Sequence, residues 1–309
     1  MKFNKEQIVI DVAGVKFGGQ IGQYPTVLIG TIFYDKHKIV SDPMKGTFDK
    51  SKAEELIKAQ EEMSDKTGNP AVLDVVGNTS EALIKYIDFA AEAAEEPFLV
   101  DSTAPEVRIE AMRHVSEVGL MRRAIYNSIM ETPRQSEIDA LRDLDVESSI
   151  ILAFNSRDMT PEGRIKVLKG EGGKTGLLDF AKEAGIQNVI VDTAVLDVPS
   201  IAYAARAIQL VREEFGLPAG CGPSNAITAW KKVKKGLMGP HAYVTTISGA
   251  ALYTSLMGGS YVLYGPIEEA YAVFPAIAMA DAMTAYYAKR TYNVKPEPGK
   301  HPMYKIFER

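Results

Sequence analysis

Short apolar runs alternate with longer amphipathic stretches along nearly the whole chain. The eight apolar runs cover residues 25–33, 71–77, 98–102, 123–128, 149–156, 188–193, 218–225 and 261–266. Between these runs, apolar residues recur at helical spacing over residues 51–64, 80–94, 104–118, 136–143, 176–184, 201–215 and 266–289. Strands that alternate with helices form a parallel sheet, and eight such strands close it into a barrel. The pattern therefore predicts an α/β fold, a (β/α)8 TIM barrel.

An open, doubly wound sheet is the alternative architecture for such an alternation. That fold normally carries a glycine-rich first βα turn, and no GxGxxG or GxxxxGK[ST] pattern follows any of the apolar runs. The closed barrel is therefore favoured. Residues 226–259 form a long apolar segment, which we expect to fold as one or two helices.

Both ends of the chain lie outside the predicted barrel, which we assign to residues 24–290. Residues 1–23 alternate apolar and polar positions around Ala13 and Gly14, which predicts a β-hairpin. We expect this hairpin to cover one end of the barrel. Residues 291–309 contain three prolines and are expected to wrap around the surface or a partner.

Composition and charge narrow the class of protein further. The hydrophobic fraction of 46% and the charged fraction of 24% are those of a globular protein. The net charge of -5 comes from 40 acidic and 35 basic residues spread along the chain, so no nucleic-acid partner is expected. The first residues lack the apolar core of a signal peptide, and no apolar run reaches membrane-spanning length. We therefore expect a cytoplasmic protein without a transmembrane segment.

The residues that most often bind metals in proteins are sparse and scattered. The single cysteine, Cys221, excludes an internal disulfide framework and a cysteine-rich metal site. None of the four histidines forms an HxH or HxxxH pair. We therefore expect no protein-bound metal.

Polar residues stand at the ends of most of the apolar runs. Six of these ends carry Asp or Asn, namely Asp74, Asp101, Asn127, Asn155, Asp192 and Asn225. The carboxyl ends of barrel strands meet on one face, where the active sites of TIM barrels lie. The alternative is that these residues only open loops or cap helices, positions that Asp and Asn favour. The repetition of the pattern favours a shared pocket.

The chemistry of this set narrows the expected ligand. No nucleophile with an adjacent base is present, and no lysine ends a strand. A glycosidase would need a pair of acids, for which only Asp101 and Asp192 are candidates. Several carboxylates and amides together can hydrogen-bond a flat heterocycle with mixed donors and acceptors, and a pterin is such a ring.

Four of these segments resemble the strand ends of the pterin-binding barrel in methyltetrahydrofolate–corrinoid methyltransferases. The segments are FLVDST (98–103), RAIYNSI (123–129), VIVDT (189–193) and GCGPSNAI (220–227). Over essentially the whole chain, the sequence is similar to the H subunit of tetrahydromethanopterin S-methyltransferase and to its bacterial relatives in glycine-betaine demethylation. The segments that carry this similarity are VKFGGQIGQYPTVLIGTIFY, HKIVSDPMKGTFDK and SYVLYGPIEEAYAVFP.

The resemblance implies a role for each strand-end residue. Asp101, Asn127 and Asp192 would hold the edge of the pterin, and Asn225 would act as the catalytic residue beside its N5. Asn155 at the pocket floor and Asp74 on the second strand are further candidates for pterin contacts. The sequence departs from the family pattern at Thr193, where a proline is expected, and at Pro223, which precedes Ser224. The geometry of those two loops therefore stays open.

The resemblance also implies the cofactors and partners. A methyl group would move between a corrinoid, either methylcobalamin or a separate corrinoid protein, and N5 of a tetrahydropterin. The chain lacks the Asp-x-His-x-x-Gly motif of a cobalamin-binding domain, so cobalamin would be supplied in trans. We expect tetrahydrofolate rather than tetrahydromethanopterin, and a homodimer, as in other barrels of this kind.

Three alternatives stay open at this point. The chain could be the H subunit of a membrane-bound tetrahydromethanopterin S-methyltransferase complex, or a non-catalytic pterin-binding scaffold. A dihydropteroate synthase is the third alternative, because it is also a pterin-binding barrel. That enzyme would need basic side chains near the last strands, where Lys232, Lys234 and Lys235 lie in a helical stretch.

Overall fold

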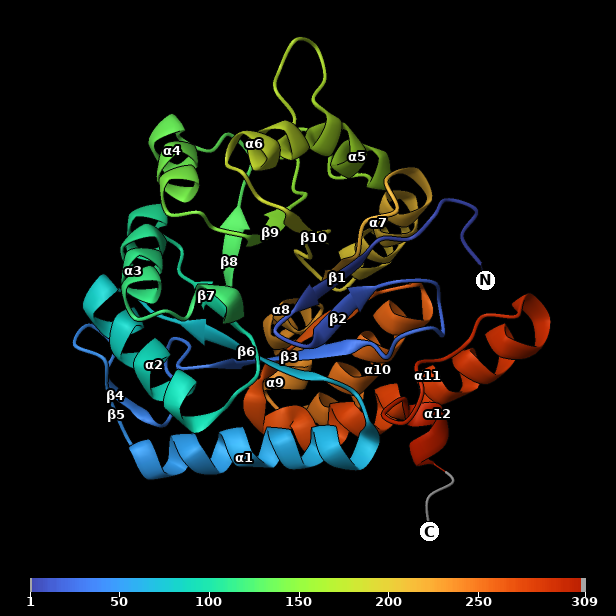
Figure 1. The fold of residues 1–309 in the computed structure, drawn as a ribbon. Helices are drawn as coiled ribbons and strands as arrows, with labels where there is room; N and C mark the ends of the chain where they lie inside the picture. Colours follow the sequence, from blue (N-terminus) through green and yellow to red (C-terminus); the bar gives the residue numbers. More distant parts are fainter. Residues whose placement is uncertain (1, 307–309) are drawn as a thin grey trace.

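The computed structural model describes residues 2–306 and has a closed barrel of eight parallel strands at its centre (Figure 1). The strands are β3 (Val27–Ile32), β6 (Ala71–Val76), β7 (Phe98–Asp101), β8 (Ala124–Ile129), β9 (Ser148–Leu152), β10 (Asn188–Asp192), β11 (Ala219–Cys221) and β12 (Tyr261–Pro266). They pair in chain order, and β12 closes the ring against β3. Each strand coincides with one of the eight apolar runs, so the predicted barrel is confirmed.

Helices surround the barrel on the outside. They are α1 (Lys50–Thr67), α2 (Ser80–Ala93), α3 (Pro105–Glu117), α4 (Gln135–Asp143), α5 (Pro161–Lys169), α6 (Leu177–Glu183), α7 (Ser200–Glu214), α8 (Ser224–Ala229), α9 (Lys231–Lys234), α10 (Ala242–Leu256), α11 (Ala270–Tyr292) and α12 (Pro302–Lys305). Several begin at side-chain caps, since Asp49, Thr79 and Thr160 each accept a hydrogen bond from a backbone N–H in the first turn. None of the helices in residues 2–306 is both long enough and apolar enough to span a membrane.

The structure differs from the sequence-based expectation in a few elements. The periodicity does not predict α5, because Gly163 and Arg164 are buried on this helix beside Ile165 and Leu168, which interrupts the apolar pattern. Residues 226–259 are expected to form one or two helices, whereas the structure has parts of α8 together with α9 and α10. Gly236 and Gly239 adopt positive φ angles of 68° and 100° between α9 and α10, which interrupts the helical path. A small hairpin of β4 (Val40–Asp42) and β5 (Thr47–Phe48) is also not predicted.

The predicted N-terminal hairpin is present as β1 (Val9–Val12) and β2 (Val15–Gly18). Its two-residue turn has positive φ at both Ala13 and Gly14, as a type I′ hairpin turn requires. The inward side chains of the hairpin share a core with the interior of the barrel, in which Phe17 packs edge-on against Tyr261. This hairpin, dark blue in Figure 1, therefore closes the N-terminal end of the barrel and leaves the opposite end for a site.

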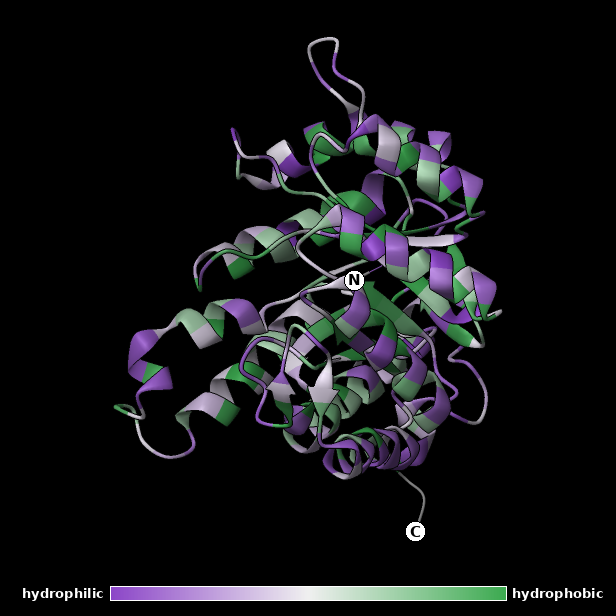
Figure 2. Cartoon of the chain, turned by 90° about the vertical axis from the view of Figure 1, so that its left-hand side faces the viewer, coloured by the Kyte–Doolittle hydropathy of each residue, from purple (hydrophilic) through white to green (hydrophobic). Residues whose placement is uncertain are grey.

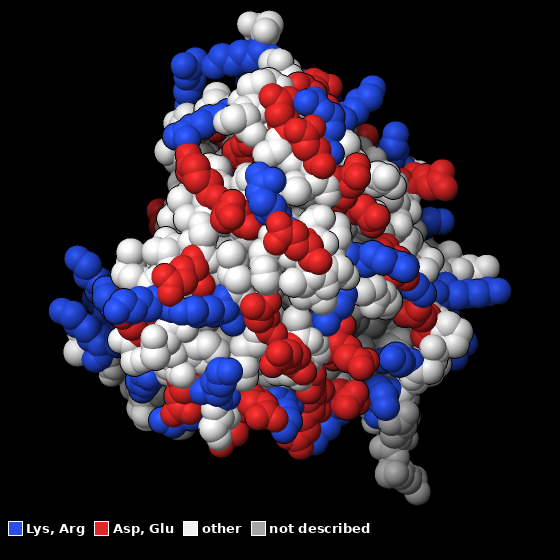
Figure 3. Space-filling view, turned by 60° about the vertical axis from the view of Figure 1, so that its left-hand side comes forward, with Lys and Arg blue, Asp and Glu red and all other residues white. Residues whose placement is uncertain are grey.

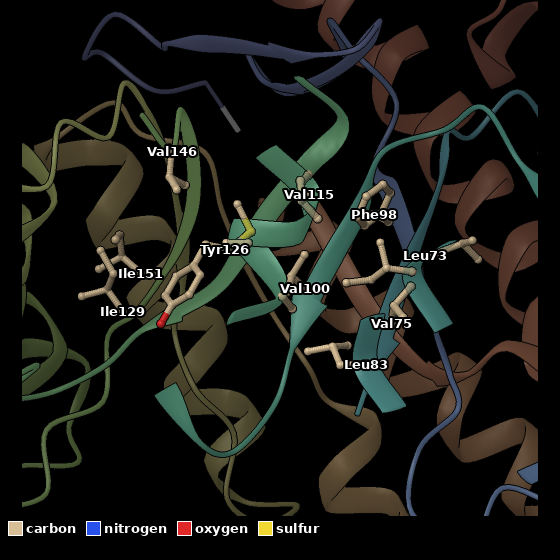
Figure 4. Close-up of a cluster of buried hydrophobic side chains, with 14 of the residues drawn as sticks. Leu73, Val75, Leu83, Phe98, Val100, Val115, Tyr126, Ile129, Val146 and Ile151 are labelled. Atoms are coloured by element: carbon tan, nitrogen blue, oxygen red, sulfur yellow. The ribbon is translucent and has the colours of Figure 1, made fainter. Parts of the chain in front are cut away.

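A second core fills the layer between the strands and the helices. Leu73, Val75, Phe98 and Val100 point outward from β6 and β7 into this layer, where Leu83 of α2 and Val115 of α3 also lie (Figure 4). Hydrophilic and hydrophobic residues alternate along the helices (Figure 2), and acidic and basic side chains intermingle on the face drawn in Figure 3.

The alternation of strand side chains decides what reaches the interior. Successive residues of a strand face opposite sides of the sheet. Because Leu73, Val75 and Val100 point outward, their neighbours Asp74 and Asp101 point into the barrel.

Candidate functional site

A cavity of about 510 Å³ opens at the C-terminal ends of the strands. Its lining residues are Thr31, Asp74, Val76, Asp101, Ser102, Thr103, Arg108, Asn127, Ser128, Met130, Leu152, Phe154, Asp192, Ala194, Val195, Leu196, Gly222, Ser224, Asn225 and Leu263. The volume is in the usual range for a pocket that binds a small molecule. Five of the six strand-end residues predicted for the site line this one cavity.

The structure does not bring the sixth residue, Asn155, to the cavity. It lies three positions beyond the end of β9, and its Nδ2 donates a hydrogen bond to the carbonyl of Gly163 at 3.1 Å. Its Oδ1 accepts from the backbone N–H groups of Arg157 and Asp158 at 3.0 and 3.1 Å. Asn155 therefore organises the loop between β9 and α5, and Phe154 occupies the lining position instead.

Two carboxyl groups lie side by side at the ends of β6 and β7. The hydroxyl of Thr31 donates to Asp74 Oδ2 at 2.9 Å, whereas Asp74 Oδ1 is buried with no hydrogen-bond partner among the described residues. Burial raises the pKa of Asp74 well above its ordinary value, and the charge of Asp101 raises it further. Burial also raises the pKa of Asp101, to about 6, against the opposing positive charge of Arg108. With a pKa of about 6, Asp101 is ionised at neutral pH, and its charge favours a proton on the neighbouring carboxyl group of Asp74.

Asn127 and Asp192 extend the polar edge around the barrel. Asn127 stands on β8 directly beside Asp101 in the strand register. Asp192 ends β10, is buried, and accepts a hydrogen bond from the N–H of Ala194 at 2.7 Å. Burial raises the pKa of Asp192 to about 6, and the hydrogen bond from Ala194 opposes that rise.

Asn225 occupies a different kind of position, in the first turn of α8 just after β11. Its side chain is exposed, and its amide has no hydrogen-bond partner among residues 2–306. Gly222 lies beneath it, where an added Cβ would be 3.8 Å from Asn225 Nδ2. The amide at the rim of the cavity is therefore free to bind a ligand.

Sequence reasoning missed several lining residues because they have no recognisable pattern. Thr31 and Ser102 look like ordinary strand and loop residues, and Arg108 looks like a charged position on a surface helix. The structure buries Arg108 completely and places it against the cavity. Arg108 follows Asp101 within the same strand–helix unit, which is the one feature of the sequence that connects it to the site. Sequence alone could not distinguish a buried arginine from a solvated one.

No lysine is among the described residues that line the cavity. Lys232, Lys234 and Lys235 are exposed on α9 and just after it. These three lysines, the candidates for a dihydropteroate synthase site, are therefore not brought to the cavity.

The cavity combines a polar edge with an apolar wall. Carboxyl and amide groups of β6, β7, β8 and β10 form the edge, and the wall consists of Met130, Leu152, Phe154, Val195, Leu196 and Leu263. An ionised carboxylate accepts hydrogen bonds only, whereas an amide both donates and accepts. Such a site suits a flat, partly apolar heterocycle whose edge carries N–H donors.

Comparison with known proteins gives full-length relatives. A family model described as the tetrahydromethanopterin S-methyltransferase MtrH subunit matches residues 5–296. The H subunit of tetrahydromethanopterin S-methyltransferase from Methanothermobacter thermautotrophicus is 44% identical, and the alignment covers 99% of each chain. The protein of the same name from Methanocaldococcus jannaschii is 46% identical over 93% of this chain and 94% of that one.

Solved structures with the same fold are more distant in sequence. A dihydropteroate synthase from Yersinia pestis with a pterine-sulfa conjugate superposes with a TM-score of 0.59 at 13% identity, covering 89% of this chain and 99% of that chain. A dihydropteroate synthase from Coxiella burnetii in complex with pteroic acid has a TM-score of 0.59 at 16% identity, covering 85% and 94%. These similarities establish the TIM-barrel fold alone. The family match and the relatives establish more: this chain belongs to the family of the H subunit of tetrahydromethanopterin S-methyltransferase.

Proposed function

We propose that this protein transfers a methyl group between N5 of a tetrahydropterin and the cobalt of a corrinoid that another molecule delivers. The observation that carries the proposal is the meeting of Asp74, Asp101, Asn127, Asp192 and Asn225 around one cavity. The sequence pattern and the family resemblance assign these five residues to a pterin site, together with Asn155, which lies outside the cavity. Membership of a methyltransferase-subunit family supports the same reaction class.

The comparisons favour a different pterin from the one expected on sequence. The expectation from sequence is tetrahydrofolate, whereas the relatives reported above are all named for tetrahydromethanopterin. We therefore propose tetrahydromethanopterin as the preferred substrate and the chain as the H subunit of a methyltransferase with further subunits. A homodimer, a cytoplasmic location and the lack of a protein-bound metal stay predictions.

The residues of the polar edge fit the donors and acceptors of a pterin ring. The ionised carboxylates of Asp101 and Asp192 accept hydrogen bonds, which matches the 2-amino group and the N3–H of the ring. Asn127 can donate and accept, which suits the remaining ring nitrogens and the oxygen at position 4. The unpaired Oδ1 of Asp74 leaves one more buried polar atom for a ligand to satisfy. The apolar wall would pack against a ring face.

The step at N5 is the difficult one chemically. When the methyl group leaves N5, the electron pair of the N–C bond stays on nitrogen, and without a proton that nitrogen would leave as an amide anion, which is a poor leaving group. Asn225 can stabilise that nitrogen with a hydrogen bond but has no proton to transfer, so the proton comes from solvent or a hydrogen-bonded network. Most of the rate enhancement then comes from positioning the two reactants.

The corrinoid is a substrate that supplies or accepts the methyl group at its cobalt. The exposed position of Asn225 at the rim of the cavity supports delivery from outside. A bound pterin would present N5 toward that rim if Asn225 contacts it. This arrangement requires no cobalamin-binding segment in the chain itself.

Pterin binding is expected to weaken as the pH falls through about 6. Burial raises the pKa values of Asp101 and Asp192 to about 6, and protonation removes the charged acceptors that the ring needs. Each group then lowers the affinity by about tenfold between pH 7 and pH 5. Isothermal titration calorimetry with tetrahydromethanopterin and with tetrahydrofolate, from pH 5 to pH 8, measures this dependence.

The same titration separates the alternatives. Binding of at least one pterin at pH 7.5, with weaker binding at pH 5, supports the proposed site, and tighter binding of tetrahydromethanopterin supports the pterin assigned here. A scaffold with only a remnant site would bind neither pterin, whereas a non-catalytic pterin-binding scaffold would bind one without transferring a methyl group. An affinity that stays constant down to pH 5 would show that Asp101 and Asp192 do not act as charged acceptors.

A further inference from the structure

Arg108 is a buried cation at the edge of the cavity. It lies in the first turn of α3, which follows β7, and only 1% of its surface is exposed. Among the described residues that line the cavity, it is the one with a positive charge. Burying a charge costs free energy, so the contacts of the Arg108 guanidinium should show which part of the site this side chain stabilises.

The guanidinium group joins the loops that follow two of the proposed pterin ligands. Its Nη1 donates to the carbonyl of Ser102, which follows Asp101, and its Nη2 donates at 3.1 Å to the carbonyl of Ser128, which follows Asn127. One side chain therefore fixes the backbone immediately after both ligands. The two strands that carry them, β7 and β8, are neighbours in the barrel.

A buried counter-ion and an aromatic ring hold the guanidinium from behind. Nη2 also donates to Glu137 Oε1 on α4 at 3.2 Å, and the Tyr126 hydroxyl donates to the same oxygen at 2.6 Å. The guanidinium carbon lies 5.0 Å from the centre of the Tyr126 ring. These contacts give Arg108 a defined orientation.

One donor of the group is left over. The Nε of Arg108 is buried and has no hydrogen-bond partner among the described residues. An unpaired buried donor is unfavourable, and such a group in a native structure calls for an explanation. A purely structural clamp does not provide one, whereas a water molecule bound in the adjacent cavity would.

We infer that Arg108 is a positioning residue for pterin recognition, which sets the placement of Asp101 and Asn127 and directs its positive charge at the carboxyl groups of the cavity. This inference rests on the proposed function, since it takes a pterin as the ligand. Arg108 acts through its neighbours, and the methyl group and N5 are outside its role.

The electrostatic part of this role has a measurable signature. The charge of Arg108 on α3 and the side chain of Asp74 on β6 both lower the pKa of Asp101. The charge of Asp101 in turn raises the pKa of Asp192 on β10. Burial raises the pKa of Asp101 to about 6, and Arg108 is the largest influence in the opposite direction. Removing the arginine charge is therefore expected to raise the pKa of Asp101 further, so that pterin binding is lost at a higher pH.

Three variants separate the charge of Arg108 from its packing. Arg108→Met removes the charge, Arg108→Lys keeps the charge without the planar fork, and Glu137→Gln keeps the guanidinium but removes its counter-ion. Arg212→Met is the matched control, because Arg212 is also buried and binds backbone carbonyls, but at the hairpin end of the barrel. Circular dichroism verifies the fold of each variant, and calorimetry with tetrahydromethanopterin gives the affinity at each pH.

The pH midpoint, at which half of the pterin affinity is lost, is expected to move when the charge near Asp101 changes. For Arg108→Met we expect about tenfold weaker binding at pH 7 and a midpoint that is about one pH unit higher than in the wild type. Arg108→Lys should bind more weakly with the wild-type midpoint, Glu137→Gln should lower the midpoint, and Arg212→Met should leave it unchanged.

Each result decides the inference. A wild-type midpoint in both Arg108→Met and Glu137→Gln would overturn it, even if both variants bind more weakly. If Arg108→Met does not fold, the direction of the shift in Glu137→Gln decides alone. Failure of the wild-type protein to bind any pterin would instead contradict the proposed function, so the two outcomes are distinguishable.

Discussion

Asp192→Asn is expected to abolish measurable pterin binding and, at the same time, to stabilise the unliganded protein. The substitution keeps the size of the side chain and an oxygen that can accept the hydrogen bond from the N–H of Ala194. It removes the negative charge and turns two donor hydrogens toward the donors of the pterin ring. We expect an affinity at least about 100-fold lower, because a buried donor facing a donor leaves both unpaired.

The gain in stability follows from the pKa of Asp192. Burial raises this pKa from an ordinary value of 3.8 to about 6, so folding favours the protonated form. The stabilisation from that proton is fully present below the unfolded-state pKa and is lost as the pH rises through 6. At pH 7.5 the buried charge therefore costs up to about 3 kcal/mol, which asparagine avoids. Urea unfolding at pH 7.5 and pH 4.5 should show the difference mainly at the higher pH.

Asp281→Asn is the matched control for this prediction. Asp281 on α11 is also buried, and burial also raises its pKa to about 6, but it does not line the cavity. It accepts hydrogen bonds from Thr26 and Asn69. The control should bind pterin with wild-type affinity. Unchanged pterin affinity in Asp192→Asn would remove Asp192 from the recognition edge.

Asn225→Ala is expected to slow methyl transfer by about 100-fold or more, with little change in pterin affinity. The amide is exposed and has no partner among the described residues of the unliganded protein, so its loss costs the fold little. Its hydrogen bond would strengthen only as N5 gains the electron pair of the breaking bond, and interactions of that kind affect the rate more than the binding. Single-turnover kinetics and calorimetry measure the two quantities separately.

The control for Asn225 is an asparagine at the other end of the barrel. Asn188 begins β10, and its amide donates to the hydroxyl of Ser148 at 3.0 Å. Asn188→Ala removes the same functional group far from the cavity and should transfer methyl groups at the wild-type rate. A rate for Asn225→Ala within a few-fold of the wild type would eliminate its proposed catalytic role.

The fold was predictable because the strands of a parallel barrel are buried on both faces. Such strands are continuous apolar runs, which stand out against the amphipathic helices. The polar residues at their ends were conspicuous for the same reason, as with Asp101 after Phe98–Val100. The alternation of apolar and polar residues around Ala13 and Gly14 predicted the N-terminal hairpin, whereas the positive φ of Ala13 could not be predicted, because alanine rarely adopts it.

Some site residues could not be predicted, because their positions depend on where a strand ends and on contacts with segments that are distant in the sequence. Asn155 and Asn127 both lie near the end of an apolar run, but Asn127 is inside β8, whereas β9 ends at Leu152 and the amide of Asn155 turns back toward Gly163. Arg108 and Arg164 occupy helix positions that periodicity assigns to solvent, yet both are buried against loop carbonyls. Burial of a long cationic side chain is visible only once the neighbouring loops are in place.

The absorption spectrum of cobalamin tests the central claim most directly. Methylcobalamin and the wild-type protein are mixed with tetrahydromethanopterin, and in a parallel reaction with tetrahydrofolate, under anaerobic conditions at pH 7.5. We predict that the methylcobalamin spectrum is lost at a rate that depends on the protein, with one N5-methyl pterin formed per cobalt and a faster reaction with tetrahydromethanopterin. An unchanged spectrum with both pterins, at concentrations where calorimetry shows the pterin to be bound, would contradict the account.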